Sequence, residues 1–177
     1  MPDLWNVVIG GRTSTVSGMT TSRFIRPAQG ELLGPIDGVR DRFLLDSTQT
    51  DGRLAVVEHL LAPRAIAAPV HRHRNEDEYS FVLEGRIGAI FDGVEVIAEP
   101  GDLVLKPRGE WHTFWNADGT PARLIELITP GGLEDLFRRI DRGVSDTEFD
   151  RLVASHGCEV DLEQTSPLIE KYGLTFG

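Results

Sequence analysis

Three histidines and one glutamate form the group of side chains with the clearest chemical potential in this 177-residue sequence. His71 and His73 are two positions apart, so in a strand both imidazoles point to the same face. Glu78 follows five positions later, and His112 opens a later apolar run just after a Pro-Arg-Gly turn. Neutral imidazoles and a carboxylate together bind divalent Mn, Fe, Co, Ni, Cu or Zn. A His-x-His pair alone is weak evidence, because most such histidines are exposed or make one ordinary hydrogen bond.

Short apolar or alternating runs indicate the strands that must position these side chains. Asp92-Gly93 fits a two-residue hairpin, because a type I′ turn needs positive φ at both central residues. The sequence Glu-Pro-Gly-Asp at 99–102 fits a type II turn. Strands at this spacing are typical of an antiparallel sandwich or barrel, so we predict an all-β domain. The predicted strands cover 54–61, 79–83, 87–91, 94–98, 102–106, 112–115 and 122–128.

The C-terminal part of the chain changes to helical spacing. Apolar residues recur at intervals of three and four over 133–140, and the sequence Ser-Asp-Thr-Glu at 145–148 is a capping box for a second helix. A third, short helix is predicted over 166–172. We expect these helices to cover an edge of the β domain rather than to bind a partner. The expected organisation is an N-terminal extension (1–26), a β-barrel (27–132) and a helical C-terminal extension (133–177).

Composition excludes several classes of partner and compartment. The chain has 18 Lys and Arg against 28 Asp and Glu, a formal net charge of -10, so we expect no nucleic acid or membrane partner. Its single cysteine, Cys158, allows no intramolecular disulfide and no thiolate zinc cluster, which fits a reducing compartment. No apolar stretch is as long as a membrane span, and the first residues lack the features of a signal peptide. We therefore expect a cytoplasmic protein.

The residues around the histidines follow two fixed spacings. The first consists of Pro-Val-His-Arg-His at 69–73, then Glu78 and Gly85. The second consists of Gly101, Pro-Arg-Gly at 107–109, then His112 and Asn116. These spacings resemble the two signature motifs of the cupin superfamily, with Ala65 replacing the leading glycine of the first motif. The second motif matches at every defining position, with a chance on the order of one in a million per starting position.

The resemblance covers about residues 52–132 and implies a double-stranded β-helix, the cupin jelly-roll barrel. It implies that His71, His73, Glu78 and His112 bind one divalent transition metal per chain, leaving one or two coordination positions open. An open position is typical of a catalytic rather than a structural metal. Glu78 would then be both a ligand and the candidate catalytic base. Small cupins usually pair, so the resemblance also implies a homodimer.

Strand alternation predicts the lining of the barrel interior. If Glu78 and His112 point inward, four further side chains also do so. These predicted pocket residues are Ser80, Val82, Phe114 and Asn116. Trp111 and Trp115 then face outward, toward a partner sheet or subunit. Few charged groups line such a cavity beyond the ligands, so a mostly apolar or aromatic ligand fits better than a phosphorylated sugar.

The remaining polar side chains of interest have less specific interpretations. Glu58 and Glu126 lie in the middle of predicted strands, where an inward proton-transfer role and a solvated face are equally good explanations. We interpret His59 and His156 as structural or surface histidines. Cys158 follows a helix end and is expected to be a partly buried small side chain.

Within the cupins, the ligand set is similar to that of single-domain quercetin dioxygenase-like proteins. The first functional hypothesis is therefore a metal-dependent dioxygenase, an oxidoreductase acting on a small, largely apolar or aromatic enol or phenol. A metal-dependent isomerase, decarboxylase or lyase is the second hypothesis, and a non-catalytic small-molecule-binding cupin is the third. Three imidazoles and a carboxylate accept most first-row metals, so the sequence names neither the metal nor the substrate.

Overall fold

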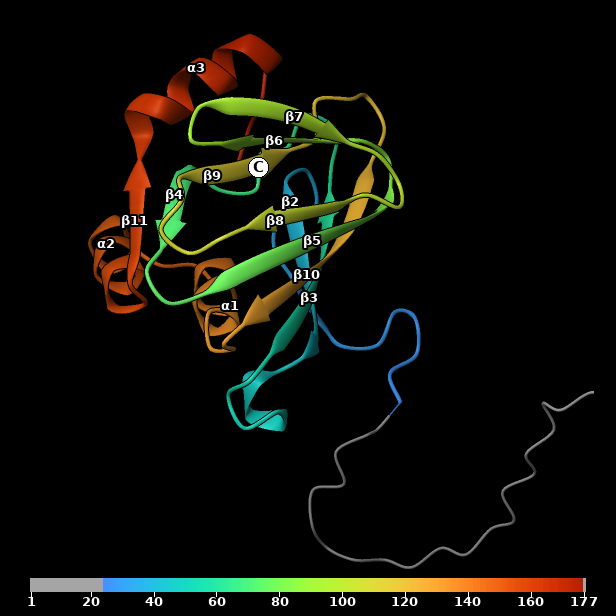
Figure 1. Ribbon diagram of the computed structural model, residues 1–177, viewed down its shortest axis with the longest axis vertical. Helices are drawn as coiled ribbons and strands as arrows, with labels where there is room; N and C mark the ends of the chain where they lie inside the picture. Colours follow the sequence, from blue (N-terminus) through green and yellow to red (C-terminus); the bar gives the residue numbers. More distant parts are fainter. Residues whose placement is uncertain (1–23, 177) are drawn as a thin grey trace, which may run out of the picture.

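The computed structural model describes residues 24–176, in which two antiparallel sheets face each other (Figure 1). The strands are β1 (Glu31–Leu33), β2 (Val39–Leu45), β3 (Ala55–Leu61), β4 (Val70–His73), β5 (Asp77–Glu84), β6 (Ile87–Phe91), β7 (Val94–Ala98), β8 (Leu103–Lys106), β9 (His112–Trp115), β10 (Ala122–Thr129) and β11 (Cys158–Asp161). The larger sheet has the order β1-β2-β3-β10-β5-β8, and the smaller has the order β11-β4-β9-β6-β7. The predicted fold class, an all-β jelly-roll barrel with a C-terminal helical extension, is confirmed. Most of the predicted N-terminal extension, residues 1–23, lies outside the described residues.

The strands predicted between residues 54 and 128 are all present, within two residues at each end. The turn between β6 and β7 confirms the hairpin prediction, because Asp92 and Gly93 both have positive φ, 44° and 85°. Gly85, between β5 and β6, also has positive φ, and a Cβ there would lie 2.8 Å from the Ala122 Cβ. A larger residue at position 85 would therefore collide with β10 as well as strain the turn.

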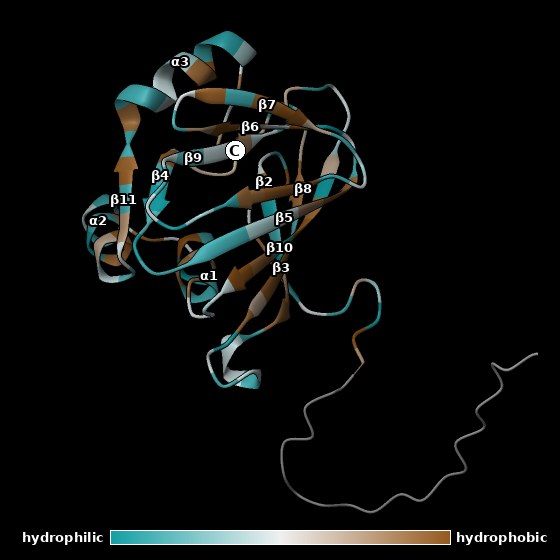
Figure 2. Cartoon of the chain, in the orientation of Figure 1, coloured by the Kyte–Doolittle hydropathy of each residue, from teal (hydrophilic) through white to brown (hydrophobic). Residues whose placement is uncertain are grey.

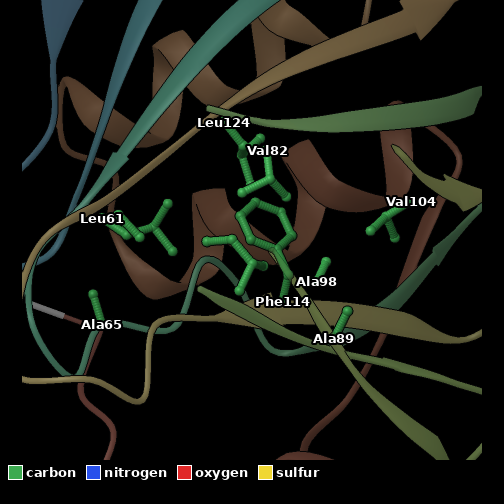
Figure 3. Close-up of a cluster of buried hydrophobic side chains, with 10 residues drawn as sticks. Leu61, Ala65, Val82, Ala89, Ala98, Val104, Phe114 and Leu124 are labelled. Carbon is green, nitrogen blue, oxygen red and sulfur yellow. The ribbon is translucent and has the colours of Figure 1, made fainter. Parts of the chain in front are cut away.

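One end of the space between the sheets is filled by apolar side chains (Figure 3). Phe114, on β9, lies among side chains from β3, β5 and β10 in this cluster. The cluster consists of Leu61, Ala65, Val82, Ile87, Ala89, Ala98, Val104, Phe114, Ala122 and Leu124. Burial of this apolar surface contributes roughly 25 cal/mol per Å², so this cluster stabilises the closed end of the barrel.

The extension contains three helices, α1 (Glu134–Asp141), α2 (Asp146–Ser155) and α3 (Leu162–Tyr172). The capping box predicted for the second helix is present, between Ser145 and Glu148. The third helix begins four residues earlier than predicted, because the Asp161 side chain accepts a hydrogen bond from the Gln164 amide, 2.9 Å away, and caps it. No helix among residues 24–176 is long and apolar enough to span a membrane.

The extension is not purely helical, which corrects the sequence-based expectation. Strand β11 lies between α2 and α3 and pairs with β4, where Cys158 is opposite His73 and Val160 is opposite His71. The chain after residue 132 therefore extends the smaller sheet beside the strand that carries two histidines. Its four residues alternate between apolar and polar, but the run is too short to predict a strand by itself and is held by pairing to β4.

The outward side of β9 is covered by the protein's own C-terminal helix. Trp115 is fully buried, and its ring centroid lies 5.3 Å from that of Tyr172 on α3. Trp111 is half-buried beneath the Arg72 guanidinium. We had expected Trp115 to face a partner sheet or subunit, but the protein's own helix α3 covers it. The homodimer stays a prediction, although the edge strands β7 and β8 carry exposed apolar side chains and hydrophobic colour in Figure 2.

Candidate metal centre

The structure brings the three histidines and Glu78 together at one end of the barrel. His71 and His73 lie on β4, Glu78 lies on β5, and His112 lies on β9 directly opposite His71 in the sheet. One potential ligand atom from each of the four residues lies within 4.8 Å of all the others. The spacing of two along β4 puts both of its histidines on the same face, and the β4–β9 pairing supplies the third.

Hydrogen bonds on the far side of two imidazoles fix how they face the cluster. The Nδ1 atom of His71 lies 2.7 Å from the Pro69 carbonyl oxygen, and that of His112 lies 2.9 Å from the Glu110 carbonyl oxygen. A carbonyl can only accept, so both Nδ1 atoms carry the proton and both Nε2 atoms keep a free lone pair. This is the tautomer that binds a metal through Nε2.

The third imidazole is supported by sulfur instead of a carbonyl. The Nδ1 atom of His73 lies 3.2 Å from Cys158 Sγ, on the neighbouring strand β11. The Nε2 atoms of His73 and His112 are buried and have no hydrogen-bond partner among the described residues. Buried polar atoms without a partner are rare and costly. Both atoms face a carboxylate across a gap in which a divalent cation would bind all of them, so the donor set fits a metal.

Charge around Glu78 keeps its carboxylate ionised. Its Oε2 atom lies 3.5 Å from His73 Nε2, 3.4 Å from His112 Nε2 and 2.9 Å from Lys106 Nζ. Burial alone raises the pKa of Glu78, but the Lys106 ammonium and the two imidazoles hold it well below its usual value. Burial and the other two histidines lower the pKa of His71, which leaves it in the neutral form that a metal requires.

Lys106 is a functional residue that our sequence analysis missed. Only 1% of it is exposed, and its Nζ atom lies between two carboxylates, 2.9 Å from Glu78 and 2.6 Å from Glu126. Ser80 Oγ donates a further hydrogen bond of 2.8 Å to Glu126. Alternation along β8 contained the signal, because Val104 points inward and position 106 must then do the same.

A cavity of about 460 Å³ adjoins this cluster. The barrel provides its polar wall, which includes His71, His73 and Glu78. Helix α2, which lies beside β11 in Figure 1, and helix α1, which packs against β2 and β3, provide much of its apolar wall. The apolar side chains from these two helices are Leu136, Phe137, Ile140, Phe149 and Val153. The predicted C-terminal extension therefore completes the cavity rather than only covering an edge.

Of the four predicted pocket residues, only Phe114 lines this cavity. Ser80 is one layer behind the wall, where it donates to Glu126, and Val82 packs in the hydrophobic core. Asn116 ties down the turn after β9, because its side-chain nitrogen donates to the backbone carbonyls of Ala62 and Thr120. The inward direction was predicted correctly, but apolar packing fills the end of the barrel at which Val82 and Asn116 lie.

His59, interpreted from the sequence as structural or surface, is a buried histidine that also lines the cavity. It is 5% exposed, and its Nδ1 atom lies 2.7 Å from Asp41 Oδ1. Glu126 points inward and is fully buried, whereas Glu58 lies on the outer face of the same sheet between Arg42 and Arg123. The two glutamates with equivalent interpretations in the sequence thus have opposite orientations.

Comparison with known proteins identifies the barrel. Residues 57–128 match the family model described as "Cupin domain". An oxidoreductase, iacF, of Pestalotiopsis fici is 50% identical over 100 residues, which cover 56% of this chain and 47% of that protein. Quercetin 2,3-dioxygenase of Bacillus subtilis is 27% identical over 99 residues, 56% of this chain and 29% of that protein. The chain therefore spans about half or less of the length of these two relatives.

Two further proteins extend the comparison. The tetracenomycin polyketide synthase protein TcmJ of Streptomyces glaucescens is 27% identical over 111 residues, 63% of this chain and 71% of that protein. Among solved structures, KdgF from Halomonas superposes with a TM-score of 0.55 at 18% identity, covering 63% of this chain and 98% of that one. At this identity the structural likeness shows the fold alone.

Proposed function

We propose that this chain is a small cupin that acts as a metal-dependent oxygenase of the dioxygenase type on a small, largely apolar or aromatic enol or phenol. One observation carries the proposal: a donor set of three imidazoles and a carboxylate has two of its imidazoles and the carboxylate at the wall of a cavity that is otherwise mostly apolar. An oxidoreductase and a quercetin dioxygenase among the relatives of the barrel support this choice.

The residues that would hold the metal are His71, His73, Glu78 and His112. A divalent first-row ion bound there would act as a Lewis acid that lowers the pKa of a substrate hydroxyl beside it. Glu78 is the proposed catalytic base, because its ionised carboxylate lies at the cavity wall within reach of that hydroxyl. Lys106 fixes the position of this carboxylate through Oε2 and balances its charge.

The shape of the cavity supports an aromatic substrate. Its volume of about 460 Å³ is within the usual range for small-molecule sites. Phe114 from the barrel, Phe137 from α1 and Phe149 from α2 contribute rings to its wall. Aromatic faces stack on such rings and gain more than buried area alone provides. No arginine lines the cavity among the described residues, which disfavours a phosphorylated substrate.

Oxygen consumption tests this proposal directly. Purified protein supplied with Mn, Fe, Co, Ni, Cu or Zn in turn is expected to consume oxygen when a flavonol is added. His112→Ala should abolish that consumption, and His156→Ala, which changes a histidine outside the cavity, should leave it intact. Product formation from the same flavonol under strict anaerobiosis would rule out the oxygenase.

A metal-dependent isomerase, decarboxylase or lyase is the second candidate. The observation that favours it is a set of buried acid–base groups that lines the cavity beyond the ligands and includes Asp41, His59 and Glu126. Such groups suit proton transfer without oxygen. Anaerobic turnover that is lost in His112→Ala would support this candidate over the oxygenase.

A further inference from the structure

A second polar group lines the cavity, consisting of Asp41, His59, Glu126 and Asp141. His59 is its central member, and its ring lies between two rings of the cavity wall, with centroids 5.4 Å from Phe114 and 5.9 Å from Phe137. Asp41, 2.7 Å from the Nδ1 atom, can only accept when ionised, so it fixes the proton on that nitrogen. The Nε2 atom is 3.9 Å from Glu126 Oε2, which is too long for a hydrogen bond.

The surroundings of His59 favour a charged imidazole. Burial alone lowers its pKa, but Asp41 on β2 and Glu126 on β10 raise it above the usual value, against a smaller opposing effect of Lys106 on β8. Asp141 on α1 is the remaining titratable group that lines the cavity on this side. A charged His59 presents an Nε2 proton that no group among the described residues accepts within hydrogen-bond distance.

Acceptors without partners lie beside this donor. Glu126 is fully buried, and its Oε1 atom has no hydrogen-bond partner among the described residues. The same holds for the Oδ2 atom of Asp141. Buried carboxylate oxygens without a donor are costly, so they point to a ligand that supplies hydroxyl groups at this place.

We propose that His59 determines substrate specificity by donating a hydrogen bond from Nε2 to a second oxygen of the substrate, away from the oxygen that faces the metal centre. Glu126 accepts a hydrogen bond from a hydroxyl group at the same end. This inference rests on the proposed function and narrows its substrate class. The ligand is an aromatic compound with oxygen groups at two separate positions rather than one enol alone.

Two flavonols with a common metal-binding end test the inference. Both 3-hydroxyflavone and quercetin carry the same hydroxyl and carbonyl pair, but quercetin has further hydroxyls on its outer rings. Binding of each is measured anaerobically at pH 6 to the purified full chain, so that contributions from the common end cancel. One hydrogen bond to a charged donor corresponds to about a tenfold preference for quercetin.

The preference should fall about tenfold in His59→Phe, because this change keeps a ring of similar size and removes the donor. His59→Gln should retain part of it, because the amide can donate from a similar position. Asp41→Asn keeps the imidazole, withdraws the negative charge and should weaken the preference; it also serves if His59→Phe does not fold. His156→Gln is the matched control and should equal the wild type.

A preference for quercetin that is as large in His59→Phe as in the wild type would overturn the inference. So would equal affinities, or no binding of either flavonol, in the wild-type protein. The proposed function fails separately: a clear preference for quercetin with no oxygen consumption would remove the oxygenase and leave the role of His59 standing.

Discussion

The metal centre and the second polar group belong to the same cavity but are assembled differently. All members of the metal centre lie between residues 71 and 112, on β4, on β5, which follows it after a short turn, and on β9, which follows after β6, β7 and β8. The second polar group combines β2, β3, β10 and α1, from residue 41 to residue 141. Lys106 connects the two, because its ammonium contacts both Glu78 and Glu126. The metal centre can be recognised in the sequence because its residues follow fixed motif spacings. The second polar group cannot, because only the tertiary fold brings its residues together.

Removing one metal ligand should give the largest effect and should leave the second polar group unaffected. We expect His112→Ala to lower metal affinity by at least about 100-fold, more than the loss of a supporting residue costs, because His112 is a proposed ligand itself. Elemental analysis after dialysis should show metal falling from about one equivalent per chain to a small fraction. His59→Gln is the control and should keep its metal. Equal metal content in the two variants would refute the assignment of the metal centre.

Removing Lys106, which links the two groups, should give the second-largest effect, a loss of stability. Lys106→Met leaves Glu78 and Glu126 buried without their common cation, which is expected to cost about 3–5 kcal/mol in the free energy of unfolding. Urea denaturation measures this loss. The double variant Lys106→Met/Glu126→Gln should recover part of it, because one uncompensated charge is removed. A loss below about 1 kcal/mol would show that the two groups do not depend on Lys106.

The second polar group should have its own pH dependence, through Asp141. Burial and the charge of Asp41 raise the pKa of Asp141 to about 7, whereas the unfolded chain ionises near its usual value. Between about pH 4 and 7 the unfolded state therefore releases a proton that the folded state keeps, and stability falls as pH rises. Asp141→Asn should remove this loss and stabilise the protein at pH 8 by about 1–2 kcal/mol, because the half-buried side chain is partly screened.

Unfolding midpoints in urea at pH 4 and pH 8 provide the measurement for Asp141→Asn. The difference between the variant and the wild type should be small at pH 4 and should reach its full size near pH 8. Asp135→Asn, a change on an exposed side of the same helix, is the control. An Asp141→Asn variant with the wild-type pH dependence would contradict the environment described for this group.

Removing the Cys158 sulfur, which supports the His73 imidazole, should give the smallest effect. Cys158→Ala removes the sulfur 3.2 Å from His73 Nδ1 and is expected to weaken metal binding by about tenfold, the low end for a residue that orients a ligand. Metal titration with a competing chelator measures the change. Complete loss of metal would mean that Cys158 is itself a ligand, and an unchanged affinity would mean that β11 only pairs with β4.

The same contrast explains what could be predicted from the sequence. The barrel strands and the four convergent side chains followed from alternation and motif spacing. Strand β2 was missed because Asp41 puts a charge at an inward position of its pattern, and the structure stabilises Asp41 by pairing with His59 on the neighbouring strand. Strand β11 was missed because only its pairing with β4 holds it.

The cavity could not be placed from alternation alone. Alternation gives the inward side of each strand but not which end of the barrel is packed and which is open. Val82 and Asn116 were assigned to the open end for this reason. His59 was interpreted only as structural or surface, because its partner, Asp41, lies 18 positions away on another strand.

The elements that cover the cavity, α1, α2 and β11, come late in the chain, and this order has a consequence for how the protein matures. The chain leaves the ribosome with its N-terminal part first, at about 5–20 residues per second. The four donor side chains and β10 emerge before α1, α2 and β11, which close the cavity and brace β4. In the nascent protein the donor set is therefore exposed to solvent before the C-terminal elements cover it. We expect the ion to be acquired in that interval, so that cofactor loading precedes enclosure.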